Sequence, residues 1–130
     1  MSGVDHGRTS RNRGWTAVAT GGVAVEAIAL VGTAVVYAFH AGGAEVPMLS
    51  VGIAAFCALS GAGLGLVAVG LWRGRRWAVA PALTWQVLQI FAGFSLMSSL
   101  PWLGAPMIPV AVATLVAVSA LRREAQSATA

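Results

Sequence analysis

Glu26 is the residue whose type and position in this sequence could most readily do chemistry. It lies inside a long apolar run, eleven residues after Trp15, or about 16 Å along a helix axis. A carboxylate near the middle of a membrane-spanning helix costs roughly 2.5–3.5 kcal/mol on insertion scales unless it is partnered or neutralised. Desolvation disfavours the charged form of a carboxyl. We therefore expect Glu26 to face other helices rather than lipid.

Three other polar residues fall at about the depth of Glu26. Counted from the tryptophans that flank an arginine-rich loop, Gln86 is nine residues into its apolar run, and Gln89 and Ser60 are each twelve residues into theirs. Together the four residues could form a structural polar cluster that holds helices together. Alternatively, they could form a proton or cation site at Glu26, because intramembrane carboxyls are often functional, or a contact with another subunit.

Small residues accompany these polar residues at helical spacing. Two stripes share a 4-3-4 spacing, namely Gly22, Glu26, Ala29 and Thr33, and Ala82, Gln86, Gln89 and Gly93. Because small and polar residues mark helix contacts in membranes, we predict that the two stripes face each other. Gly61 and Gly65 form a GxxxG motif, which predicts a further close helix contact without naming the partner.

Nothing else in the sequence predicts a catalytic, metal or cofactor site. The sequence contains no GxSxG, no HExxH and no phosphate-binding loop, and two of its four carboxylates, Asp5 and Glu124, lie near the ends. Cys57 stands alone inside an apolar run, and His40 and Glu45 lie in a polar loop. We expect no enzyme activity, no cofactor and no metal.

Composition places these residues in a bilayer. Hydrophobic residues make up 58% of the chain and charged residues 9%, with a mean hydropathy of +0.80. Such a chain has too few polar residues to cover a water-soluble core. The net charge of +4 comes from arginines clustered beside apolar runs, which indicates membrane topology rather than nucleic-acid binding. We expect a multi-pass protein of the plasma membrane.

Four apolar runs predict an all-α, up-and-down bundle of four transmembrane helices. The helices are expected at about 15–39, 48–72, 77–97 and 103–121, and together they form one membrane domain over 15–121. Turn residues at 40–47 and 98–106 separate the first pair and the last pair. Residues 1–14 are predicted to be a mobile basic tail, and residues 122–130 a second tail.

The arginines predict orientation. Three lie in residues 1–14, three in the loop after the second run (Arg73, Arg75 and Arg76) and two after the fourth run, with none in the other loops. By the positive-inside rule, both termini and this loop are cytoplasmic. Trp15 and Trp77 are expected at the cytoplasmic interface, and Trp102 at the opposite one.

Two family resemblances follow from these residues. The stretch GGVAVEAIALVGT resembles the first helix of the small multidrug resistance family, whose embedded glutamate exchanges protons for cationic drugs; the resemblance would give that role to Glu26. The GRRWA element at residues 74–78, with Pro81-Ala82 and Gln86, is similar to uncharacterised small four-helix membrane proteins of actinobacteria. That family has no established activity.

Two functions are compatible with these features. The first is a small accessory or scaffold component of a membrane assembly, which packs against itself or a larger complex within the lipid bilayer. The second is a proton-coupled transporter or channel formed by a homo-oligomer, with Glu26 alternately protonated and cation-bound.

Overall fold

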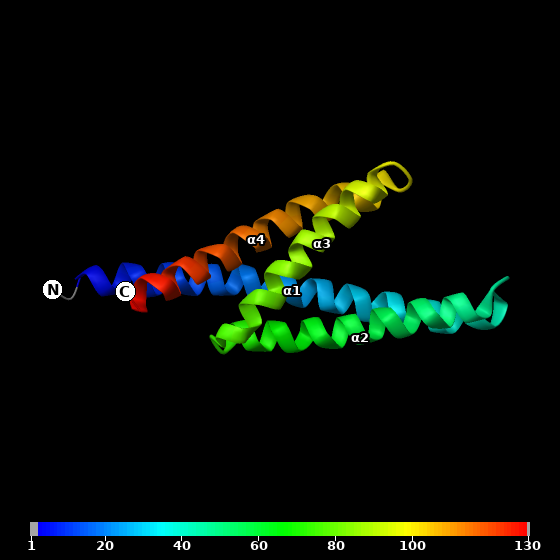
Figure 1. Ribbon diagram of the computed structural model, residues 1–130, viewed down its shortest axis with the longest axis horizontal. Helices are drawn as coiled ribbons and strands as arrows, with labels where there is room; N and C mark the ends of the chain where they lie inside the picture. The colour runs from blue at the N-terminus through cyan, green and yellow to red at the C-terminus, as the bar shows by residue number, and fades with distance from the viewer. Residues whose placement is uncertain (1–2, 130) are drawn as a thin grey trace.

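Four long α-helices account for nearly all of the structure, a computed structural model that describes residues 3–129, with side chains described from residue 10 onward. The helices are α1 (Gly3–His40), α2 (Pro47–Trp72), α3 (Val79–Met97) and α4 (Pro101–Thr129) (Figure 1). Two short 3-10 helices, η1 (Ala41–Gly43) and η2 (Arg76–Ala78), lie in the first two connections.

Each of the four helices is long and apolar enough to cross a membrane. The candidate spans are Ser10–Gly43, Pro47–Trp72, Arg76–Met97 and Pro101–Thr129. Each exceeds the length of about 20 residues that a bilayer requires. The prediction of an all-α chain with four potential transmembrane helices is therefore confirmed.

The first and last helices continue into the segments that the sequence predicted as tails. Helix α1 begins at Gly3 rather than near residue 15, and α4 ends at Thr129 rather than near residue 121. Extending an existing helix fixes one residue per added hydrogen bond, whereas starting a new one is costly. An ion pair joins the two extensions, with Arg11 Nε 3.5 Å from Glu124 Oε1. Residues 1–2 and 130 of the predicted tails lie outside the described residues.

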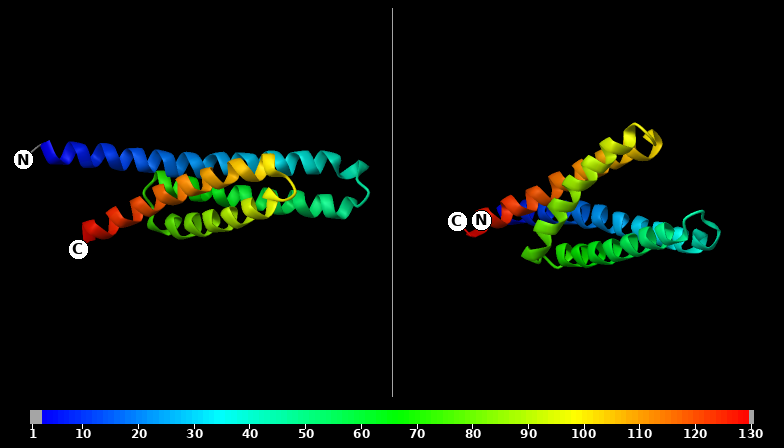
Figure 2. Two further views of the ribbon diagram at one scale, coloured as in Figure 1. Left: turned by 90° about the horizontal axis from the view of Figure 1, so that it is seen from above. Right: turned by 45° about the vertical axis from the view of Figure 1, so that its right-hand side comes forward.

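The four helices form two hairpins. Helix α1 packs against α2, and α3 packs against α4. Between the hairpins, α1 contacts α4, whereas α2 and α3 make few contacts. We call the end with both chain termini and the α2–α3 connection the basic end, and the other the open end. Figures 1 and 2 show the α3–α4 hairpin diverging from α1–α2 toward the open end.

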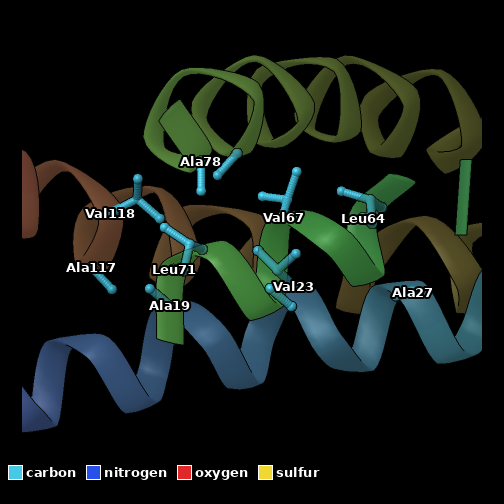
Figure 3. Packing of buried hydrophobic residues seen from close by; sticks show 11 residues of the cluster. Ala19, Val23, Ala27, Leu64, Val67, Leu71, Ala78, Ala117 and Val118 are labelled. Atoms are coloured by element: carbon cyan, nitrogen blue, oxygen red, sulfur yellow. The ribbon is translucent and has the colours of Figure 1, made fainter. Parts of the chain in front are cut away.

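The core lies in the half of the molecule nearer the basic end, where all four helices meet. Its buried members are mostly small and come from every helix (Figure 3): Ala19, Val23, Ala27, Leu64, Val67, Ala68, Leu71, Ala78, Ala82, Ala117 and Val118. Small residues let helix backbones approach closely in a membrane. Only 17–28% of the most apolar window of each span is buried within the chain, so most of each window is exposed on the surface of the single chain.

The α2–α3 connection is a tight, hydrogen-bonded turn. Gly74 adopts a positive φ of 66°, its N–H donates to the Leu71 carbonyl at 3.0 Å, and the Arg75 N–H donates to the Gly70 carbonyl at 2.8 Å. This pair of bonds is the Schellman motif, which needs a left-handed residue just past the helix end. Gly74 meets that need without strain. The turn fixes where the arginines of this loop emerge.

Candidate buried polar site between the hairpins

Glu26 and Gln86 form a buried hydrogen bond that joins the two hairpins. Glu26 lies on α1 and is 8% exposed, and Gln86 lies on α3 and is fully buried. The Gln86 Nε2 amide donates to Glu26 Oε2 at 2.9 Å. Glu26 thus faces the other hairpin, as the sequence predicted, and Gln86 satisfies one of its two oxygens.

Two further side chains of α3 approach the Glu26 carboxyl. Gln89 and Trp85 are both half-buried and lie close to it, although neither completes a hydrogen bond with it. Three buried acceptor oxygens in this group, Glu26 Oε1, Gln86 Oε1 and Gln89 Oε1, lack a donor among the described residues, as the Trp85 ring N–H lacks an acceptor. An unpaired buried polar atom costs about 1–3 kcal/mol, so the group has spare capacity for a proton or a cation.

Ser60 does not join this group. It is half-buried on α2, and among residues 3–129 its hydroxyl makes no side-chain hydrogen bond. Helix α2 turns its small residues, such as Ala54, Cys57 and Gly61, inward instead. Equal depth therefore does not bring Ser60 to Glu26, because α2 and α3 belong to different hairpins and make few contacts.

The two small-residue stripes meet only around Glu26, which Gln86 and Gln89 approach. A methyl group on Gly22 would overlap the Thr114 hydroxyl of α4, and one on Gly93 would lie 2.9 Å from Ile108 Cγ1, also on α4. Ala29 and Thr33, at the other end of the α1 stripe, are exposed. The predicted face-to-face arrangement is thus wrong beyond this one contact, because the hairpins separate toward the open end.

Of the GxxxG pair, only Gly61 makes a close helix contact. A Cβ on Gly61 would lie 2.9 Å from Val31 Cγ2 and 3.1 Å from the Ala27 carbonyl oxygen of α1, whereas a Cβ on Gly65 would meet nothing within 4 Å. Gly65 instead lines a shallow groove between α1 and α2. The close approach expected from the motif therefore depends on one glycine.

The packing of α4 includes two residues that the sequence analysis did not single out. Gly104 would place a Cβ 2.7 Å from the Gly93 carbonyl oxygen, and Thr114 is 2% exposed. The Thr114 hydroxyl donates to the Val110 carbonyl at 2.9 Å, which satisfies it inside its own helix. These two residues could have been predicted from a stripe of mostly small residues at helical spacing, namely Gly104, Ala111, Thr114 and Val118.

The predicted anchors differ in environment. Trp15 packs against the core, and the ring of Trp77 lies over Gly70, where a Cβ would come within 3.0 Å of Trp77 Cζ2. Trp102 is 72% exposed near the open end. Arg73, Arg75 and Arg76 are all exposed in the α2–α3 connection. The sequence predicts all three tryptophans at the membrane interfaces. Trp15 and Trp77 also pack against the protein, whereas Trp102 is largely exposed.

Metal ligands do not gather in the described part of the chain. Among those residues, no three His, Cys, Asp or Glu side chains lie where they could hold a metal ion together, and Cys57 is buried as a free thiol. Glu26 is surrounded by amides and an indole instead. The carboxyl at this site can take up or release a proton, and its unpaired oxygen can accept a hydrogen bond.

Comparisons of this chain with protein-family models, with curated proteins and with solved structures find no match. Both family resemblances stay predictions drawn from the sequence.

Proposed function

We propose that this chain is a multi-pass component of a plasma-membrane assembly, with its four helices passing up and down through the bilayer. Both termini and the α2–α3 connection lie on the cytoplasmic side. The distribution of all eight arginines supports this orientation, since they occur only in these three segments.

An unpartnered stripe on α1 is the observation that carries this proposal. Its members are all exposed and repeat at helical spacing: Gly21, Val25, Ile28, Gly32, Val35 and Phe39. Neither Gly21 nor Gly32 has any other helix within 4 Å of where a Cβ would lie. Glycine destabilises a helix by about 1 kcal/mol relative to alanine, and lipid gives no reason to retain it. Contact with another helix gives such a reason, because glycine permits two helix backbones to approach closely.

The open end supports the same proposal. There the hairpins separate, and each leaves large apolar side chains exposed, such as Phe39 at 84%, Met48 at 81% and Trp102 at 72%. A bundle of this size that buries so little of itself gains packing by associating with copies of itself or with other membrane subunits.

The test is the size of the assembly in native-like lipid. Protein extracted gently from its own membranes is expected to be larger than a monomer by light scattering, or to retain a co-purifying subunit. Gly32→Leu, which adds bulk to the stripe, should shift it toward monomer. Ala92→Leu on the exposed face of α3 is the matched control and should not. A wild type that is monomeric and free of other proteins would contradict the proposal.

A second candidate function is proton-coupled transport of cations through Glu26. The unpaired acceptor oxygens of Glu26, Gln86 and Gln89 favour it, as does the resemblance of the first helix to the small multidrug resistance family. The carboxyl lies at the contact between the two hairpins, which is where a cation could exchange.

Reconstituted vesicles distinguish this second function. Uptake of a lipophilic cation, driven by an imposed proton gradient, should be lost in Glu26→Gln and retained in Glu45→Gln, which changes the carboxyl of the α1–α2 connection. Equal uptake by wild type and Glu26→Gln, or none by either, would exclude it.

A further inference from the structure

A large cleft opens at the basic end, outside the Glu26 site. It has a volume of about 1290 Å³, and its walls come from α1, the end of α2, the α2–α3 connection, α3 and α4. That volume exceeds the roughly 300–1,000 Å³ typical of sites for drug-sized ligands. The helical extensions at both ends of the chain, which the sequence predicted as tails, form part of it.

Four arginines from three different segments line this cleft. Arg13 comes from α1, Arg75 and Arg76 from the α2–α3 connection, and Arg122 from α4. The one acidic residue among the lining residues, Glu124, is already paired with Arg11, whose Nε lies 3.5 Å from Glu124 Oε1. The described side chains therefore leave the cleft strongly positive.

The interior of the cleft is apolar. Its floor includes Leu71, Trp72, Val79, Leu83 and Leu121, which lie in the parts of the candidate spans nearest the basic end. A small water-soluble anion could use the arginines but would gain nothing from this floor. A molecule with an anionic head and apolar chains matches both parts.

The turn between α2 and α3 holds two of the arginines in place. The Arg75 N–H donates to the Gly70 carbonyl at 2.8 Å, and the Ala78 N–H donates to the Arg75 carbonyl at 3.2 Å. Trp77 packs over Gly70 and further restricts the turn. An ordinary topological loop needs charge but no such fixed geometry.

We propose that this cleft binds an anionic phospholipid of the adjacent leaflet. The phosphate lies among Arg13, Arg75, Arg76 and Arg122, and an acyl chain lies along the apolar floor toward the bilayer. Basic pockets between transmembrane helices recognise anionic headgroups in this way, and guanidinium groups suit phosphate through paired hydrogen bonds.

A charge-matched pair of variants tests the proposal. Arg75→Gln with Arg122→Gln removes two arginines that line the cleft, whereas Arg73→Gln with Arg123→Gln removes two from the same segments that do not line it. Both variants lose the same net charge from the same segments. Any general attraction between the positive protein and anionic membranes is therefore weakened equally in both.

The measurement is the association of spin-labelled phosphatidylglycerol, relative to spin-labelled phosphatidylcholine, with the full-length protein in bicelles. Each surface arginine near anionic lipid contributes a factor of about five to affinity. The cleft variant is thus expected to lower the preference about 25-fold if both contacts are direct, and the control variant to lower it much less, by the general charge effect alone. No preference in the wild type, or equal loss in both variants, would overturn the proposal.

A second pair of variants tests the apolar floor without touching charge. Ala17→Trp narrows the cleft, while Val18→Trp places the same side chain on the neighbouring exposed residue outside it. Only Ala17→Trp should reduce the lipid preference. Inorganic phosphate at millimolar concentration should compete weakly, because it lacks the chains; full displacement by phosphate would show an anion site rather than a lipid site.

Discussion

Contacts within each hairpin and contacts between the hairpins follow different rules. Within the hairpins, glycines bring backbones together, with Gly61 against α1 and Gly104 against Gly93 of α3. Between the hairpins, contact is confined to the half near the basic end, where small apolar residues meet, Gly22 packs against Thr114, and one polar pair, Glu26 and Gln86, is buried. Each hairpin is therefore a tightly fitted unit, and the junction between them is the part with freedom to open or recruit a partner.

The largest expected effect is within the α3–α4 hairpin. Gly104→Val would force its Cβ against backbone, 2.7 Å from the Gly93 carbonyl oxygen and 2.9 Å from the Met97 nitrogen. Overpacking against atoms that cannot rotate away should lower the free energy of unfolding by about 3 kcal/mol. Unfolding in mixed micelles measures it. Ala105→Val, at the exposed neighbouring position, is the control, and equal stability of the two variants would contradict this contact.

The next effect is at the junction between the hairpins. Gln86→Leu removes the donor to Glu26 Oε2 and leaves the carboxyl without a hydrogen bond among the described residues, so stability should fall by about 2 kcal/mol. Gln89→Leu removes the same group where no hydrogen bond to Glu26 exists and should cost much less. A double-mutant cycle with Glu26→Leu should give a coupling of about 0.6–1.7 kcal/mol. Zero coupling would mean that this bond does not hold the junction.

A smaller effect separates the two glycines of the GxxxG motif. Gly61→Ala would place a methyl group 2.9 Å from Val31 Cγ2, a side chain that can adjust, and should destabilise the α1–α2 hairpin by about 1 kcal/mol. Gly65→Ala meets open space in the monomer and should change stability by less than about 0.5 kcal/mol. If Gly65→Ala is the more harmful of the two in native membranes, then Gly65 contacts another subunit.

The smallest effect concerns the helical extensions at the basic end. A double-mutant cycle with Arg11→Ala and Glu124→Ala should give a coupling of about 0.5 kcal/mol, because the Arg11 side chain is 64% exposed and solvent reaches the Glu124 side chain, which is 28% exposed. Added salt should reduce it, since exposed charges are screened. A coupling that does not change between low and high salt would show that the two extensions are held by packing instead.

The number of helices and the inward position of Glu26 were predictable from the sequence. The reason is that a bilayer imposes a length of about 20 apolar residues on every span and a high cost on any carboxylate facing lipid. Both constraints act on a single helix and need no knowledge of its neighbours. Depth also placed Gln86 among the candidate partners of Glu26, together with Gln89 and Ser60, but did not single it out.

Which helices touch, and over what length, was decided by the tertiary structure. Depth places a residue along the membrane normal but not around the bundle, so Ser60 shares the level of Glu26 without reaching it, and Gly65 repeats the motif of Gly61 without a contact. The crossing of the hairpins set these outcomes, and it also drew the arginines of three separate segments around one cleft. The sequence by itself determined four apolar helices with a buried carboxyl, because a lipid bilayer requires apolar spans and disfavours a carboxylate that faces lipid. Only the packing of the helices against one another decided which groups that carboxyl and those arginines contact.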